Sequence, residues 1–494
     1  MRIACALGVA AALWLAPARA QVLEIATDQS PVGLDPHVAT SFATQLVTGT
    51  IYEGLTAIDS GLRVVPALAQ SWTVSEDGKT YRFQLRPGAA FHNGRPVAPA
   101  DVIASVQRVR DPKTGSPYAS RFVSVAAVEP DGDNAVRFTL EQPSAPFLSQ
   151  LAALVIIPQE EEAGLARKPV GTGPFRFREW VPDTYIALDR NQAYWDQGLP
   201  RLAGLKFNIV PEAATRQLGI QGGTYRMLPS LDPATATALE NQSRVKLLST
   251  QDLAYSVIGL NTSKPPFDKA EVREAVNLAI DRGQIVQAAY FGKAAPAGPL
   301  SPALKDWALP TAEFPCYRTD PAAARKKLQD AGLPPPVKVT LNVLGSLPLV
   351  LDIAQIVQAQ LNQAGFEVTL NVQEQGRFIQ DWRAGNFQAF ASLNSGGPDP
   401  DDYFGRTFAT GGATNVFKYS NPELDGWLAE ARAARDPLAR KRLYDQAQRV
   451  LACQGPAVHL AYGTLFTAVR ADVQGFEPNA TRSLRALRET RIGP

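Results

Sequence analysis

Histidine and cysteine are scarce in this chain of 494 residues, and their scarcity limits the chemistry that it can perform. The three histidines, His37, His92 and His459, lie far apart in the sequence. No HExxH, no CxxC and no His/Cys cluster at zinc spacing occurs. No G-x-S-x-G turn marks a hydrolase nucleophile. We therefore expect no metal site, no cofactor and no catalytic residue, although the frequent carboxylates leave a glycosidase or another hydrolase as an alternative.

Long apolar runs are absent beyond the first residues, which excludes a later membrane-spanning helix. The opening "MRIACALGVAAALWLAPARA" has Arg2, an apolar run and then Ala18-Arg19-Ala20. This pattern predicts a secretory signal over residues 1–20, cleaved after Ala20, and the alternative is a short buried helix. Cys5 precedes the apolar run, so we expect no lipid anchor and a protein exported across the inner membrane to the periplasm.

An excess of charge of one sign is also absent. The chain has 49 basic and 47 acidic residues, and losing Arg2 and Arg19 with the signal leaves 47 of each. Nucleic-acid binding requires a basic face, so this balance argues against a nucleic-acid partner.

After signal removal two cysteines remain, Cys316 and Cys453. In an oxidising compartment they could form a disulfide, and the long loop that it closes would stabilise the fold by about 4–5 kcal/mol in the chain-entropy treatment. The alternative is two separate buried thiols.

Helical and strand patterns alternate along the chain, which favours α/β layers. Helix starts are clear where an N-cap residue precedes proline, at Asp320-Pro321, Asn421-Pro422 and Asp436-Pro437, and Gly332 is a helix stop. Strands crowd residues 65–140 around one helix at 99–110, whereas helices dominate 265–465. This change predicts separate modules with a boundary near 260–266.

The segment "GTGPFR", residues 171–176, begins like a glycine-rich phosphate loop. It lacks the later glycine, and Pro174 and Phe175 continue into a strand-like pattern instead of a helix. We therefore do not interpret it as a phosphate site.

Five phrases together resemble the family 5 extracellular solute-binding proteins of bacteria, the dipeptide-, oligopeptide- and nickel-binding components of ABC importers. They occur in the same order as in that family and span nearly the whole mature chain: "PALAQSWTVSEDGKTYRFQLRPGAAFHNGRPVAPADVIASVQRV" (66–109), "GTGPFRFREWVPDTYIALDRNQAYW" (171–195), "GLNTSKPPFDKAEVREAVNLAIDR" (259–282), "DPAAARKKLQDAGL" (320–333) and "GGPDPDDYF" (396–404).

The resemblance implies a two-lobed, type II-like clamp with a strand-rich subdomain inserted in the first lobe. Lobe I would comprise residues 21–56, 170–259 and 467–494, with residues 57–169 as the insertion. Lobe II would comprise residues 260–466. Two chain crossings near 259–261 and 464–469 would form the hinge.

The resemblance also implies a function. Such a protein is not an enzyme: it captures a peptide or peptide-like solute between its lobes and hands it to the permease subunits of an ABC importer. We expect a monomer. Alternatives are the same clamp with a nickel chelate, an opine or an oligosaccharide, a periplasmic hydrolase, and a sensor or chaperone that delivers to no importer.

In peptide-binding relatives the loop that corresponds to "LNSGGPDPDDYF", residues 393–404, carries an aspartate that pairs with the ligand's amino group. That position is Gly396 here, with Asp399 and Asp401 close by as candidate ligand contacts. Asp401 has a structural alternative as N-cap of a helix. The backbone of Asn394, Ser395, Gly396 and Gly397 is another candidate, because glycine allows a ligand to approach main-chain donors; the alternative is a plain tight turn.

Dipeptide binders carry an arginine for the ligand carboxylate before the helix that spans about 347–362 here. The corresponding segment "VLGSLPLV" has no basic residue, so Arg226 and Arg406 become candidates, with surface ion pairs as the alternative. The segment 39–55 resembles the part of lobe I that lines the cleft. It places Ser41 and Phe42 near the ligand, and a core position is the alternative for Phe42.

Overall fold

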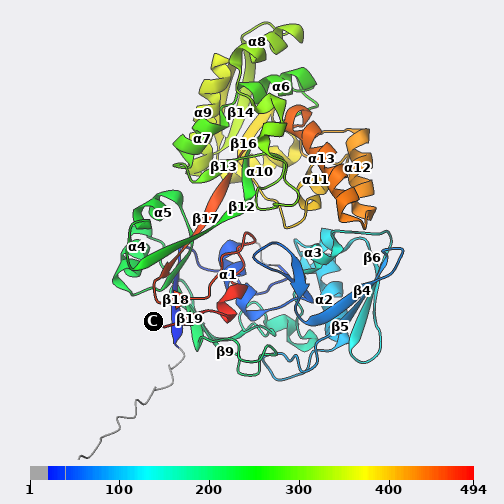
Figure 1. Cartoon of the computed structure of the whole chain (residues 1–494), viewed down its shortest axis with the longest axis vertical. Coiled ribbons are helices and arrows are strands. Elements are labelled where there is room, and N and C mark those ends of the chain that lie inside the picture. Colours follow the sequence, from blue (N-terminus) through cyan, green and yellow to red (C-terminus); the bar gives the residue numbers. More distant parts are fainter. Residues whose placement is uncertain (1–20, 39–40, 494) are drawn as a thin grey trace, which may run out of the picture.

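The computed structural model describes residues 21–38 and 41–493 (Figure 1). The predicted cleavage after Ala20 lies outside these residues. An 11-stranded sheet runs through the molecule in the order β15-β14-β16-β12-β17-β11-β1-β10-β9-β8, with β13 paired to β17. Within the described ranges, no helix is both long and apolar enough to cross a membrane.

Lobe I surrounds the β8–β11 end of this sheet. Its elements are β1 (Val22–Thr27), α1 (Phe42–Ile51), β8 (Phe175–Val181), β9 (Tyr185–Arg190), β10 (Gly204–Ile209), α4 (Ala213–Gly222), β11 (Met227–Leu231), α5 (Pro233–Leu239), β18 (Val473–Gln474), η6 (Arg485–Arg488) and β19 (Arg491–Ile492). One buried cluster joins Leu23 and Ile25 of β1 to Leu484 and Leu487 near the C-terminus. The C-terminal end of the chain therefore packs against the N-terminal strand.

The inserted region has a sheet and a core of its own. Its elements are β2 (Thr56–Ile58), β3 (Val64–Pro66), β4 (Ala69–Val74), β5 (Thr80–Leu85), α2 (Pro99–Arg110), η1 (Pro112–Thr114), η2 (Ala119–Phe122), β6 (Val125–Pro130), β7 (Ala135–Leu140), α3 (Phe147–Leu151) and η3 (Gln159–Gly164). Strands β4, β5, β7 and β6 form a four-stranded sheet. Phe83, Phe122 and Phe138 are fully buried in its core.

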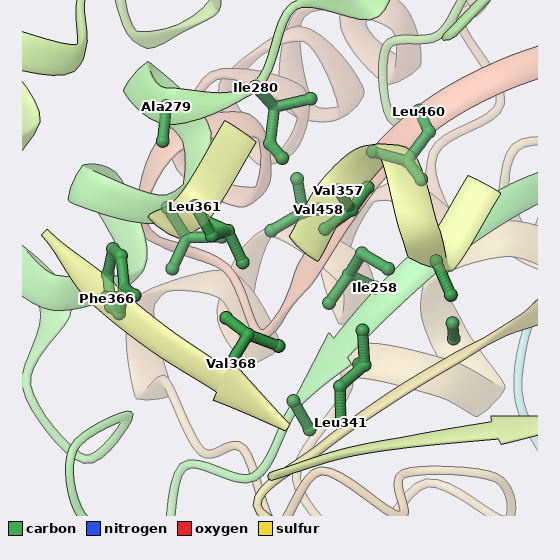
Figure 2. Close-up of a cluster of buried hydrophobic side chains, with 14 of the residues drawn as sticks. Ile258, Ala279, Ile280, Leu341, Val357, Leu361, Phe366, Val368, Val458 and Leu460 are labelled. Atoms are coloured by element: carbon green, nitrogen blue, oxygen red, sulfur yellow. The ribbon is translucent and has the colours of Figure 1, made fainter. Parts of the chain in front are cut away.

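Lobe II surrounds the opposite end of the large sheet. Its elements are α6 (Ala270–Ala279), α7 (Arg282–Ala289), β13 (Ala294–Pro296), η4 (Thr311–Glu313), η5 (Pro315–Tyr317), α8 (Pro321–Asp330), β14 (Val337–Leu344), α9 (Pro348–Gln363), β15 (Phe366–Gln373), α10 (Gln375–Ala384), β16 (Ala389–Asn394), α11 (Asp401–Phe408), α12 (Pro422–Ala433) and α13 (Pro437–Gln454). Figure 2 shows its core, in which Ile258, Leu341, Val368 and Val458 of the sheet lie close to Val357 and Leu361 of α9.

The predicted helix starts in lobe II are confirmed. Asp320 accepts a hydrogen bond from the backbone N–H of Ala323, and α8 begins at Pro321. Asn421 and Asp436 cap α12 and α13 in the same way, each followed by proline. Gly332 has a φ of +75°, a left-handed conformation that glycine adopts without steric cost.

Two long strands, β12 (Val245–Leu260) and β17 (Ala457–Arg470), connect lobe I with lobe II (Figure 1). Residues 245–251 of β12 pair with 464–470 of β17, whereas 255–259 pair with 457–462. The register shifts between Gln251 and Tyr255, and from Tyr255 onward β12 also pairs with β16 of lobe II. Residues 255–260 thus belong to the lobe II sheet, so we propose crossings at 251–255 and 462–464, and not at 259–261 and 464–469. Strand β12 continues from Val245 to Leu260 through this change of partner, so no break marks it in the chain.

Cys316 and Cys453 form a disulfide in the structure, with Cα atoms 5.6 Å apart. The bridge joins η5 to the C-terminal end of α13, next to buried Phe314 and Ala452. It closes a loop with a sequence separation of 137 residues.

We predict that the double substitution C316S/C453S lowers the free energy of unfolding by about 2–5 kcal/mol, because the unfolded chain regains the freedom that the closed loop removes. Urea denaturation of the variant and of the oxidised wild type measures the difference. Reduced wild type should have the same free energy of unfolding as the variant. Equal midpoints for all three samples would contradict the prediction.

Candidate functional site

A cavity of about 390 Å³ lies where lobe I, the inserted region and lobe II meet. Its walls come from one face of α1, the start of the inserted region, the crossing residues 252–254, the loop residues 395–398 and the C-terminal segment. The inserted region also contributes Tyr118, Arg121, Ser149, Ala152, Ala153 and Val155. Volumes of this size are typical of small-molecule sites. The described part of the chain contains no group of three His, Cys, Asp or Glu side chains that could hold a metal ion.

Helix α1 contributes one of its faces. Phe42, Gln45, Gly49 and Tyr52 line the cavity, and their spacing of three or four residues places them along one side of a helix. Phe42 is 57% exposed and is therefore not a core aromatic, and its contact with a ligand stays a prediction. Ser41 does not line the cavity. Its hydroxyl accepts from the backbone N–H of Thr44 and caps the helix.

The "GTGPFR" segment supports the end of α1 instead of binding phosphate. A Cβ atom at Gly171 would lie 2.1 Å from the carbonyl oxygen of Ile51, and one at Gly173 would lie 2.7 Å from it. Glycine is therefore required for the close approach of two backbones. Thr172 between them donates a hydrogen bond of 3.4 Å to Glu53, the residue that follows the helix.

Glu53 is a buried carboxylate in the cavity wall, with only 5% of its surface exposed. The hydroxyl of Tyr194 and the Nε1–H of Trp195 each donate to it at 2.7 Å. Burial raises the pKa of Glu53, while the nearby Arg485 and these hydrogen bonds act in the opposite direction.

The loop from "LNSGGPDPDDYF" presents its backbone to the cavity. Ser395, Gly396 and Gly397 line it together with Pro398, and their contact with a ligand stays a prediction. Added Cβ atoms would lie 1.9 Å from the Tyr403 ring at Gly396 and 2.2 Å from Oδ2 of Asp402 at Gly397. The two glycines let the loop lie directly against the first turn of α11, and the N–H of Gly396 donates to the carbonyl of Leu253 in the crossing.

The aspartates of this loop do not line the cavity, which corrects our prediction of ligand contacts at Asp399 and Asp401. Asp399 accepts two hydrogen bonds from Arg440 of α13, at 2.7 and 2.8 Å, and is 8% exposed. Asp401 pairs with Arg432 of α12 at 2.8 Å. Asp401 is not the N-cap either: Pro400 precedes the helix, and Asp399 accepts from the N–H of Asp401. Both carboxylates fix the loop to lobe II.

Three further candidates have structural roles and do not line the cavity. Asn394 donates to the hydroxyl of Tyr255 and accepts from the N–H of Ser395. Arg406 donates to the carbonyl of Ser395 at 2.8 Å and so supports the loop from behind. Arg226 lies at the start of β11 in lobe I, where it pairs with Asp472 at 3.2 Å, which is the surface ion pair named as its alternative.

Five charged residues that the sequence analysis did not identify line the cavity: Glu53, Arg121, Asp252, Arg482 and Arg485. Asp252 and Arg482 form an ion pair of 2.6 Å, and the Arg482 guanidinium lies 4.5 Å from the centre of the Phe42 ring. Arg482 also has a φ of +63°, which is uncommon for a residue with a side chain. The only signal in the sequence was the basic "TRSLRALR" near the C-terminus, combined with the expected return to lobe I.

Asp402 of α11 lies directly behind the Gly397 backbone and faces the inserted region. Burial and the neighbouring Asp399 raise the pKa of Asp402 to about 6, whereas Arg121 of the inserted region lowers it.

The sequence pattern described as "Bacterial extracellular solute-binding proteins, family 5 Middle" matches residues 63–415. The chain belongs to this family. It is therefore related to substrate-binding proteins of ABC transporters, and the expected two-lobed clamp with mixed α/β lobes is confirmed.

Among the relatives, the "Probable di/tripeptide-binding protein 5" of Pseudomonas aeruginosa is 32% identical over 97% of both chains. The "Glutathione-binding protein GsiB" of Escherichia coli K12 is 29% identical over 95% of both. Among solved structures, the periplasmic binding protein DppA from Helicobacter pylori, in complex with the peptide STSA, superimposes with a TM-score of 0.80 and 27% identity. The match covers 96% of this chain and 98% of that one.

We predict that Gly396→Ala lowers the free energy of unfolding by about 1–3 kcal/mol and weakens ligand binding, because the new methyl group overlaps the buried Tyr403 ring. Gly426→Ala in α12 is the matched control, since no atom lies within 4 Å of its Cβ position. The control should be as stable as wild type or up to about 1 kcal/mol more stable. Thermal unfolding and binding titrations of both variants test this. A Gly396→Ala variant that behaves like the control would refute the packing argument.

Proposed function

We propose that this protein is the periplasmic binding component of an ABC importer and captures a short peptide or peptide-like solute between its lobes. The observation that carries the proposal is the cavity of about 390 Å³ bounded by lobe I, the inserted region, the crossing and the lobe II loop. The names of two relatives, a di/tripeptide-binding and a glutathione-binding protein, support the solute class. Export would follow cleavage after Ala20, and the permease subunits would receive the solute unchanged.

Capture works through a shift between open and closed forms. A solute that contacts both lobes binds the closed form more tightly and therefore increases its population. Closure removes water from the cavity and strengthens each polar contact inside it. The loop residues Ser395–Gly397 line the cavity from lobe II, while α1 and the C-terminal segment line it from lobe I.

Direct contacts between the lobes outside the cavity also favour closure. Arg435, between α12 and α13, donates from Nη1 to the carbonyl of Glu76 in the β4–β5 turn at 2.6 Å. The N–H of Ala145 donates to the carbonyl of Arg432 at 2.7 Å. Because Arg432 also pairs with Asp401, these contacts are linked to the loop that lines the cavity.

We expect purified mature protein to bind at least one member of a library of di- and tripeptides, with a decrease in the radius of gyration on binding. Isothermal titration calorimetry and small-angle X-ray scattering measure the two effects. Nickel with histidine, opines and oligosaccharides form the comparison set. Binding confined to that set would refute the peptide proposal, and recovery of cleaved peptide would show an enzyme instead.

We further predict that Arg435→Ala weakens the apparent affinity for the bound peptide about 2- to 5-fold, since an exposed charge-assisted contact contributes about 0.5–1 kcal/mol to the closed form. Arg442→Ala on α13 is the control, because Arg442 is exposed and does not line the cavity. Calorimetry with the same peptide compares the three proteins. Equal affinities would show that the Glu76 contact does not contribute to closure.

A further inference from the structure

The cavity wall holds positive charge that its own carboxylates do not neutralise. Of the three lining arginines, Arg482 is paired with Asp252, which also accepts from the backbone N–H of Ala254. The charges of this pair neutralise each other. The other two lining arginines are Arg121 and Arg485.

Arg485 has no hydrogen-bond partner for its guanidinium among the described residues. Its Nε is buried and unpaired, and the side chain as a whole is 19% exposed. The nearest carboxylate is Glu53, whose Oε1 lies 3.9 Å from Nη2, beyond hydrogen-bond distance. Glu53 is already engaged by Tyr194, Trp195 and Thr172. Arg485 thus has a long ion pair with Glu53 but no hydrogen bond to it. A partly desolvated guanidinium without hydrogen-bond acceptors is unfavourable, and a solute carboxylate would supply them.

Arg121 adds positive charge to the cavity wall from the inserted region. Its guanidinium lies 5.5 Å from the centre of the Tyr118 ring, and no carboxylate among the described residues lies within 4.0 Å of it. Its electrostatic neighbour in lobe II is Asp402, which lies behind the loop backbone and does not line the cavity. Arg121 therefore reinforces the attraction of an anionic group without being a fixed partner of it.

We propose that Arg485 binds a carboxylate of the solute, so that the ligands of this protein are peptide-like acids anchored on lobe I. This assignment rests on the proposed function. The segment "VLGSLPLV" before α9 of lobe II has no arginine for the ligand carboxylate. In this proposal Arg485 of the C-terminal segment takes that role. Arginine suits the role because its planar fork can donate two parallel hydrogen bonds to a carboxylate.

The test compares peptide acids with the same peptides in which every carboxylate is converted to a carboxamide. Calorimetry first identifies the tightest-binding acid in the di- and tripeptide library. For wild type, we expect its amide to bind about 10- to 100-fold more weakly. In Arg485→Gln the affinity for the acid should fall by about the same factor, while the affinity for the amide should change less than about 3-fold. Arg485→Lys should retain part of the preference for the acid over the amide.

Arg178→Gln is the control, since Arg178 is 47% exposed in β8, pairs with Glu179 and Asp189, and does not line the cavity. It should bind acid and amide as wild type does. Thermal unfolding checks that each variant is folded. If Arg485→Gln does not fold, the acid and amide affinities of wild type and of Arg485→Lys test the assignment of Arg485.

Equal binding of acid and amide by wild type would overturn the assignment of Arg485. So would an equal loss of both ligands in Arg485→Gln, which would mean that Arg485 only positions Glu53. Failure of every peptide acid to bind would overturn the proposed function itself, and is thus distinguishable from these outcomes.

Discussion

The antiparallel pairing of β12 with β17 is the constraint on which the clamp depends. The ladder continues through both lobes but shifts register between Gln251 and Tyr255, where the Gln251 side chain donates to the carbonyls of Tyr462 and Gly463. The residues freed from the ladder, 252–254, form part of the cavity wall, and the carbonyl of Leu253 accepts from Gly396. The crossing and the loop that lines the cavity are therefore in direct contact.

The two lobes contribute different kinds of groups to the cavity. Lobe II presents backbone, because Asp399 and Asp401 are turned inward to Arg440 and Arg432. Leaving either buried charge without its partner would be costly, so these ion pairs fix the position of the loop more than they add net stability. Lobe I and the inserted region supply the charged side chains that line the cavity, apart from Asp252 at the crossing.

Local signals predicted much of the fold. Asp320, Asn421 and Asp436 marked helix starts correctly, because capping depends on residues adjacent in the sequence. A cleft-lining position for α1 was also indicated, since Phe42 belongs to segment 39–55, which resembles cleft-lining sequence in the family. In contrast, the pairing of Asp399 with Arg440 joins residues 41 positions apart, and no local pattern distinguishes that carboxylate from one that faces a ligand.

The charged residues of the cavity were harder to predict, since tertiary structure brings them together from positions 53, 121, 252, 482 and 485. The C-terminal segment is held by the Asn479 amide, which donates to the carbonyls of Ile58 and Asp59, while Leu484 and Leu487 pack in the lobe I core. The residues that complete the lobe thus also set the charge of the site. Substitutions at 480–485 change the lining of the cavity, and a substitution at Arg482 also removes its ion pair with Asp252 of the crossing.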